Sequence, residues 1–177
     1  LNSQSKVLLN ASSGKGKSTF SCILFGLRSD FKGDLLFNNK SIKDFSHDEW
    51  TEYRKSKISI VFQDLQLFSE LTVNENLTLK NSLTNSFSID EIKAMISRLG
   101  ISDKWDQKCK FLSMGQQQRV AIVRALLQPF EWLILDEPFS HLDKSNSKIC
   151  LELINEICVQ NSAGFILTSL GSSHDFY

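Results

Sequence analysis

The sequence is notable first for what it has little of: prolines, paired cysteines, long apolar runs and net charge. Only two prolines interrupt its 177 residues, and no repeat or low-complexity stretch appears. No apolar run exceeds four residues, whereas a membrane-spanning helix needs about 20, so the sequence predicts a soluble chain. Twenty basic residues balance twenty acidic ones. Without a net positive field, we expect no nucleic-acid partner.

The cysteines and histidines lack the spacing of a disulfide framework or a metal site. No CxxC pair occurs among the four cysteines, and the three histidines lie at no ligand spacing. This pattern favours free, mostly buried thiols in a reducing compartment over a metal centre. The first residues carry neither a basic start nor an apolar stretch, so no secretory signal is predicted. Because no initiating methionine is present, we expect a domain that is incomplete at its N-terminus.

What the sequence does contain is an alternation of strands and helices. Hydrophobic residues make up 41% and charged residues 23%, as in ordinary globular domains. Short aliphatic runs predict buried strands at 6–10, 58–62, 132–135 and 165–168, and helical patterns lie at 18–27, 89–99, 116–127 and 145–159. This order predicts an α/β fold with a parallel sheet. Residues 1–177 are predicted to form one domain, with a core lobe (1–64 and 119–177) and an inserted helical lobe (65–118).

A glycine-containing loop at 11–19 directly follows the first predicted strand and opens a helix. That context is the one a phosphate-binding loop needs, because converging N–H groups and the helix N-terminus attract phosphate oxygens. Lys17 is placed to reach the β- and γ-phosphates, and the Ser18 hydroxyl to ligate Mg²⁺. The alternative is a flexible linker, and Ala11 stands where glycine is usual. The predicted phosphate-binding residues are Ser13, Gly14, Lys15, Gly16, Lys17, Ser18 and Thr19.

An acidic pair ends the predicted strand at 132–135. The carboxyl ends of strands are where α/β sheets bind ligands. Asp136 would therefore hold Mg²⁺, directly or through water, and Glu137 would polarise or orient the water that attacks the γ-phosphate. The alternative is a strand that simply ends in a solvated turn; the phosphate loop far upstream favours the catalytic interpretation.

A third segment, 111–127, reads FLSMGQQQRVAIVRALL and resembles the signature region of the ATP-binding cassette (ABC) ATPases. Further ordered matches support this resemblance. Gln63 stands at the position of the family's glutamine loop. Residues 67–77 resemble the family segment that follows this loop, and residues 140–143 resemble its dimer-contact loop. The resemblance covers essentially the entire chain. The stretch 33–76 most resembles the lipoprotein-release, macrolide-export and cell-division subgroup.

The resemblance implies a P-loop NTPase with a RecA-like core, an inserted helical subdomain, and ATP and Mg²⁺ as cofactors. Two such chains, identical or different, would sandwich ATP between the nucleotide-binding residues of one chain and Ser113, Gly115 and Gln116 of the other. Nucleotide-driven closure would then drive an integral membrane permease, and the subunit would lie in the cytoplasm against the inner face of the membrane. Ser18, Gln63 and Asp136 would hold the metal, while Glu137, Gln63 and Ser169 would occupy the catalytic positions.

Three departures from the family pattern leave alternatives open. Met114 replaces the first glycine of the signature, and Ser169 stands where the family has its switch histidine. His174 is either a shifted switch residue or part of the tail. The residue that stacks on adenine would lie upstream of Leu1. A binding-only regulatory subunit therefore remains an alternative to a hydrolysing one, as does a soluble ABC protein unconnected to transport.

Overall fold

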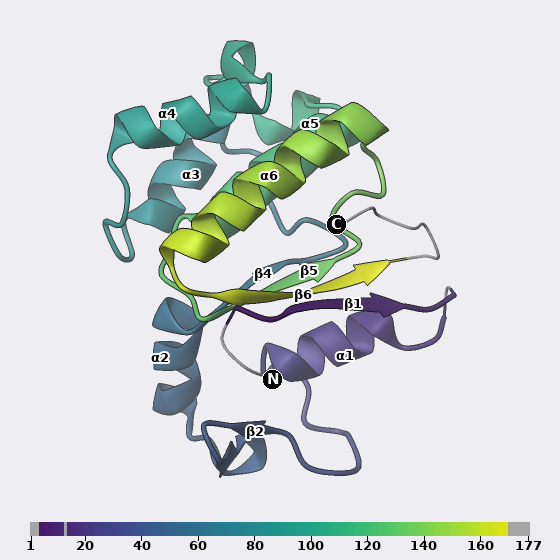
Figure 1. Ribbon diagram of the computed structural model, residues 1–177. Helices are drawn as coiled ribbons and strands as arrows, with labels where there is room; N and C mark the ends of the chain where they lie inside the picture. Colours follow the sequence, from purple (N-terminus) through teal and green to yellow (C-terminus); the bar gives the residue numbers. More distant parts are fainter. Residues whose placement is uncertain (1–3, 13, 170–177) are drawn as a thin grey trace.

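A four-stranded parallel sheet forms the centre of the molecule, as seen in the computed structural model (Figure 1). The structure describes residues 4–12 and 14–169. In spatial order the strands are β1 (Lys6–Asn10), β6 (Gly164–Ser169), β5 (Trp132–Asp136) and β4 (Ile58–Val61). All three neighbouring pairs run parallel, so their carboxyl ends share one edge. The predicted α/β class is confirmed.

Helices cover both faces of this sheet (Figure 1). Helix α1 (Lys17–Leu24) lies on one face, and α5 (Met114–Leu126) and α6 (Lys144–Gln160) lie on the other. Helices α3 (Val73–Asn81) and α4 (Ile89–Arg98) pack against α5, farther from the sheet. Three short 3₁₀ turns complete the helical segments: Ile42–Asp44, Ser102–Lys104 and Cys109–Phe111. Among the described residues, no helix has the length and apolar character needed to cross a membrane.

Capping boxes fix where most of these helices begin. In each, a Ser or Thr hydroxyl accepts a hydrogen bond from the third helical N–H, and the side chain at that third position accepts one from the cap's own N–H. Such a cap contributes about 1 kcal/mol. The predicted box of α4 is present, and α2 (His47–Ser56), α3 and α5 begin the same way. The four pairs are Ser46–Glu49, Thr72–Glu75, Ser88–Glu91 and Ser113–Gln116.

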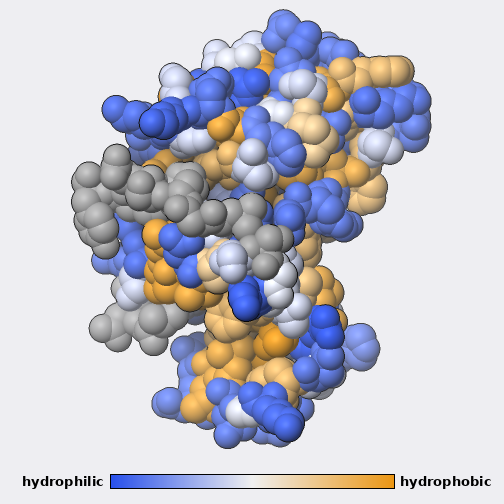
Figure 2. All heavy atoms as spheres, turned by 90° about the vertical axis from the view of Figure 1, so that its right-hand side faces the viewer, coloured by the Kyte–Doolittle hydropathy of each residue, from blue (hydrophilic) through white to orange (hydrophobic). Residues whose placement is uncertain are grey.

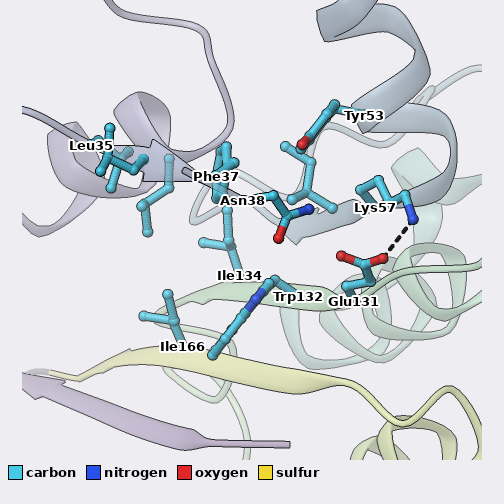
Figure 3. A pocket seen from close by; sticks show the side chains of 12 residues that line it. Leu35, Phe37, Asn38, Tyr53, Lys57, Glu131, Trp132, Ile134 and Ile166 are labelled. Carbon is cyan, nitrogen blue, oxygen red and sulfur yellow. Dashed lines mark hydrogen bonds and ion pairs between the residues drawn. The ribbon is translucent and has the colours of Figure 1, made fainter. Parts of the chain in front are cut away.

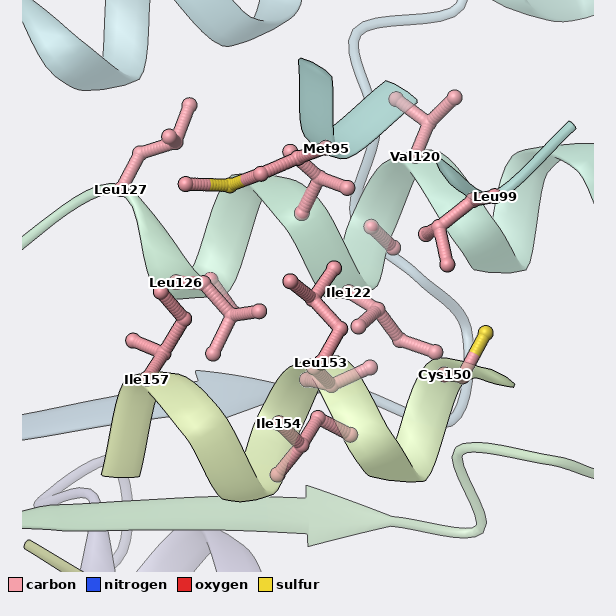
Figure 4. Close-up of a cluster of buried hydrophobic side chains, with 14 of the residues drawn as sticks. Met95, Leu99, Val120, Ile122, Leu126, Leu127, Cys150, Leu153, Ile154 and Ile157 are labelled. Atoms are coloured by element: carbon pink, nitrogen blue, oxygen red, sulfur yellow. The ribbon is translucent and has the colours of Figure 1, made fainter. Parts of the chain in front are cut away.

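The core is divided between the two faces of the sheet. Alternation along β5 sends Leu133 and Leu135 toward α5 and α6, and Ile134 toward α1. The larger cluster lies on the α5 and α6 side, where the buried side chains of those helices interdigitate (Figure 4). The cluster beneath α1 is small, with only Leu24, Ile134 and Ile166 buried in it. Most of the apolar burial therefore lies on the side of α5.

Two features differ from the sequence-based expectation. Strand β1 was expected to be buried, but it is an edge strand of the described sheet and Leu8 is 40% exposed. Helix α2 (His47–Ser56) and the hairpin of β2 (Leu36–Phe37) and β3 (Lys40–Ser41) were not anticipated. Strands β2 and β3 have two residues each, which is too short for a recognisable alternation of apolar and polar side chains. An aromatic cluster holds this region together: Phe37, Phe45, Trp50 and Tyr53.

A hollow of about 210 Å³ separates this hairpin region from the sheet. Phe37 and Tyr53 line it on one side, and Trp132 and Ile166 on the other (Figure 3). The Lys57–Glu131 ion pair, 2.5 Å long, closes one end. The hollow lies at the beginning of β4 and β5, at the opposite end of these strands from the predicted nucleotide site.

The cysteines are free, as predicted. Three of them are buried, namely Cys109, Cys150 and Cys158. Burial raises the pKa of Cys150 and of Cys158 to about 12. These thiols therefore stay protonated at neutral pH and act as small apolar core residues.

Candidate functional site

The predicted residues of the phosphate loop and of the acidic pair gather where the parallel strands end. Figure 2 looks onto this end of the molecule. The loop after β1 turns into α1 through Gly14 (φ 75°) and Gly16 (φ 84°), both in the left-handed region that favours glycine. A Cβ built on either residue would meet no atom within 4 Å. Positive φ rather than crowding therefore favours glycine at both positions; Ser13 lies outside the described residues.

Lys17, the first residue of α1, lies inside this loop. Its Nζ donates hydrogen bonds to the carbonyl oxygens of Ala11 (2.8 Å) and Ser12 (3.2 Å). The same Nζ lies 3.3 Å from Oε1 of Glu137, and the two side chains are only 6% and 8% exposed. The phosphate loop and the acidic end of β5 therefore meet through a nearly buried ion pair.

Glu137 has a backbone conformation unusual for its residue type. Its φ of 50° lies in the left-handed region, which costs a non-glycine residue about 1–2 kcal/mol. Such strained residues concentrate at functional sites, where surrounding contacts maintain them.

An all-oxygen group lies next to the loop. The Ser18 hydroxyl donates a 3.0 Å hydrogen bond to Oε1 of Gln63, which follows β4. Asp136 is 3% exposed at the end of β5. Hydroxyl, amide and carboxylate oxygens suit Mg²⁺, which takes few protein ligands and keeps its other positions for water and phosphate. Within 4–12 and 14–169, no cluster of three or more His, Cys, Asp or Glu that could bind a metal occurs.

Thr168, which the sequence analysis did not single out, connects the two acidic residues. Its buried hydroxyl donates to Oδ1 of Asp136 (2.7 Å) and accepts from the N–H of Glu137 (3.2 Å). The next residue, Ser169, is 4% exposed, and its carbonyl accepts a 3.3 Å hydrogen bond from the N–H of Ala11. The end of β6 thus touches both the acidic pair and the phosphate loop.

We expect Thr168→Val to disturb the acidic pair while preserving side-chain shape. Valine leaves a buried carboxylate oxygen and a buried N–H without their partner, at a cost of about 1–3 kcal/mol for each group. The free energy of unfolding in urea should fall by that order, and ATPase activity should fall with it. Thr168→Ser, which keeps the hydroxyl, is the matched control. Equal stability of the two variants would contradict this positioning role.

The signature residues lie elsewhere in the chain's fold. Ser113 caps α5, and its N–H donates to Oε1 of Gln116 at 2.9 Å. Gly115 lies close to the loop after β5, since a Cβ there would stand 2.8 Å from the carbonyl oxygen of His141. Within the described part of the chain, no hydrogen bond joins these residues to the phosphate loop. Ser113 and Gly115 thus lie at the start of α5, on a different element from the loop around Lys17.

Gln118 ties the signature helix to the acidic end of β5. Its sequence context gives no sign of this role, because it lies inside a longer polar run. Its side chain is 1% exposed, donates to the carbonyl of Glu137 and the hydroxyl of Ser140 (both 3.2 Å), and accepts from the N–H of His141 (3.0 Å). A displacement of α5 would thus alter the hydrogen bond that Gln118 donates to the carbonyl of Glu137.

A protonated thiol lies beneath the site. Burial raises the pKa of the Cys22 thiol, and the nearby Asp136 carboxylate raises it further. Cys22 is therefore not a nucleophile of this site at neutral pH.

The parallel sheet, the loop around Lys17 and the acidic pair beside it define a nucleotide-binding ATPase of the P-loop class. The family model described as ABC transporter matches residues 1–140. The chain belongs to this family and is one of its ATP-binding ATPases.

Curated relatives agree with this assignment. The lipoprotein-releasing system ATP-binding protein LolD of Buchnera aphidicola is 35% identical over 165 residues, which cover 91% of this chain and 72% of LolD. The macrolide export ATP-binding/permease protein MacB of Aggregatibacter actinomycetemcomitans is 32% identical over 154 residues, which cover 85% of this chain but 24% of MacB. The predicted resemblance to the lipoprotein-release and macrolide-export subgroup is confirmed.

Solved structures give the same answer for the fold. The dimeric bacterial ABC transporter cassette MJ0796 superposes with a TM-score of 0.83 at 28% identity, over 96% of this chain and 77% of that one. A post-hydrolysis form of the same cassette, bound to ADP and phosphate, superposes with a TM-score of 0.80 at 29% identity.

Proposed function

We propose that two copies of this chain form composite ATP sites and couple ATP hydrolysis to a membrane permease from the cytoplasmic side. The observation that carries this proposal is the separation of the site residues. Lys17, Ser18 and Gln63 lie with the acidic pair at the strand ends, whereas the signature residues around Ser113 lie apart at the start of α5. In a pair of chains, the start of α5 in one chain would face the carboxyl ends of the strands in the other. The related cassette MJ0796 is dimeric.

Phosphate binding would begin with an exchange of partners at Lys17. In this structure its ammonium contacts two loop carbonyls and Glu137. The β- and γ-phosphates of ATP would offer it stronger, charge-assisted partners, while the N–H groups of the loop and the N-terminus of α1 bind the remaining oxygens. Glu137 would thereby be released from its ion pair.

The released Glu137 would act as the water-orienting group or general base. Ser18, Gln63 and Asp136 would hold Mg²⁺, which neutralises charge on the phosphate oxygens when bound. Thr168 would keep Asp136 and Glu137 in register through its hydroxyl. Ser169 lies beside the loop but offers a short hydroxyl where the family has an imidazole. Loss of one aligned donor typically costs about 10²–10³ in rate, so we propose slow hydrolysis.

Complementation between two inactive variants tests the composite site. Lys17→Ala removes the phosphate-binding side chain, and Ser113→Arg places a bulky cation in the signature. Each variant alone should lack ATPase activity. In a mixed pair, one of the two sites combines an intact loop with an intact signature, so mixing should restore up to half of the activity per dimer. Single variants that keep full activity, or mixtures that stay inactive although both chains bind each other, would contradict the arrangement.

We further propose that the permease docks on residues 66–81, in the helical lobe (65–118) of the single domain. Phe68 in this segment is 53% exposed, although a large aromatic side chain is normally covered. Buried Asn76 fixes its backbone: Asn76 Oδ1 accepts from the N–H of Phe68, and Asn76 Nδ2 donates to its carbonyl, both at 3.0 Å. Phe68 is thus held on the surface.

Crosslinking tests the docking site. Cysteine introduced at Phe68 or Leu71 should crosslink to a co-expressed permease after oxidation. Cysteine at Leu36, 55% exposed on the distant hairpin, is the control and should not crosslink. Crosslinks formed only from Leu36 would contradict the proposed site.

A further inference from the structure

Two basic side chains lie half-buried near the proposed docking site without an acidic partner. Lys80 is close to the end of α3, and Arg124 projects from α5, which packs against α3. Of the ion pairs between residues that the structure describes, none involves either side chain. A half-buried cation that has no carboxylate partner is uncommon in protein structures.

Their hydrogen bonds hold them in place but do not neutralise them. Lys80 donates from Nζ to Oε1 of Gln128, whose own amide donates to the carbonyls of Arg54 (2.8 Å) and Ile58 (3.0 Å). Arg124 donates from Nη2 to the carbonyl of Leu65 at 3.3 Å. All these acceptors are neutral. An ammonium has three donors and a guanidinium five, so both groups keep capacity for a further partner.

The two charges also oppose each other. Burial lowers the pKa of Lys80, and the positive charge of Arg124 lowers it further; burial also lowers the pKa of Arg124. The lowered pKa values mean that these surroundings destabilise the ammonium of Lys80 and the guanidinium of Arg124. A carboxylate brought between them would relieve the repulsion and regain part of the lost solvation.

An exposed aromatic ring adjoins Arg124, the cation whose charge acts on Lys80. The guanidinium carbon of Arg124 lies 5.9 Å from the centre of the Phe68 ring. The apolar contact proposed for the permease and the uncompensated positive charge thus belong to one surface. We call Phe68, Lys80 and Arg124 together the basic docking surface.

We infer that the basic docking surface receives a segment of the permease in which a carboxylate stands beside an apolar residue. The apolar residue packs on Phe68, and the carboxylate pairs with Lys80 and Arg124. This inference rests on the docking proposed above and adds the chemistry that selects the partner: an acidic contact segment is favoured and a basic one is repelled.

The test is the affinity of the purified chain for its co-expressed permease in detergent, measured at low salt. Lys80→Glu should weaken binding at least tenfold, since like charges then face each other. Lys80→Gln keeps a donor for Gln128 but removes the charge, and it should weaken binding several-fold. Lys32→Glu makes the same charge change at an exposed residue of the hairpin region and should have no effect. ATP affinity should stay unchanged in all three, and the melting temperature should stay unchanged in Lys80→Gln and Lys32→Glu.

Different results separate this inference from the docking proposal. One acidic residue of the permease, changed to lysine, should restore binding to Lys80→Glu. If both Lys80 variants bind like wild type while Phe68→Asp loses binding, the docking site stands and the inference is wrong. If Phe68→Asp also binds like wild type, the docking proposal fails too. If Lys80→Glu instead changes the mass of the chain's own oligomer, the surface pairs two copies and the inference is wrong.

Discussion

Lys17→Ala is expected to weaken Mg-ATP binding by about 30- to 4,000-fold, since truncating one partner of a buried charged contact costs about 2–5 kcal/mol. Lys17 is the one lysine of the loop that is buried and directed into it; Lys15 is exposed. The measurement is titration calorimetry with ATP and Mg²⁺. Lys15→Ala is the matched control, because removing an exposed side chain leaves the loop's backbone N–H groups in place.

Loss of binding through misfolding must be distinguished from loss of the phosphate contact. Lys17→Ala leaves the nearly buried Glu137 without its cation, which itself destabilises the fold. The double variant Lys17→Ala/Glu137→Gln removes that uncompensated charge. It should recover the melting temperature but not ATP affinity. Wild-type ATP affinity in a folded Lys17→Ala chain would remove the loop from the mechanism.

Glu137→Gln is expected to lower ATP turnover by about 10²–10⁴-fold, the usual contribution of a general base. The change keeps the shape of the side chain and the left-handed backbone at this position. It removes the basic oxygen while leaving the phosphate loop intact. ATP should therefore still bind, and the chain should accumulate as an ATP-bound dimer whose mass doubles by light scattering.

The control for this variant is another glutamate at the opposite end of the same strand. Glu131→Gln changes an exposed carboxylate paired with Lys57, and turnover should stay unchanged. If Glu137→Gln retains wild-type turnover, a different group activates the water and Glu137 serves only as the resting partner of Lys17.

The strands and the site loops could be predicted because their signals are local. Residues 132–136 carry a short apolar run followed by an acidic pair, and 11–19 combine glycines with Lys17 directly after a strand. Each pattern is complete within about ten residues. The parallel order of the strands then brings the loop and the acidic pair to the same edge.

The contacts that support the site could not be predicted because they are tertiary. Thr168 touches Asp136 from a neighbouring strand, and Gln118 reaches the carbonyl of Glu137 from α5. Nothing in their local sequence distinguishes either residue from an ordinary polar one. The same holds for Leu8, whose exposure depends on which strands lie beside β1.

The pairing of Lys17 with Glu137 was likewise outside the reach of sequence reasoning. The sequence predicts a role toward ATP for the phosphate loop and for the acidic pair, but it does not indicate that Lys17 and Glu137 contact each other. We therefore expect the Glu137 carboxylate and the nucleotide phosphates to compete for Lys17. In the proposed mechanism, phosphate would displace the carboxylate of Glu137 from Lys17 before that carboxylate acts on water.

The most direct test of the account is steady-state phosphate release by the purified wild-type chain, with Glu137→Gln as the blank. We predict slow release above the blank that requires Mg²⁺ and rises more steeply than in proportion to chain concentration, because only the dimer contains complete sites. Release equal to the blank while ATP is bound would contradict the account and identify the chain as a binding-only subunit.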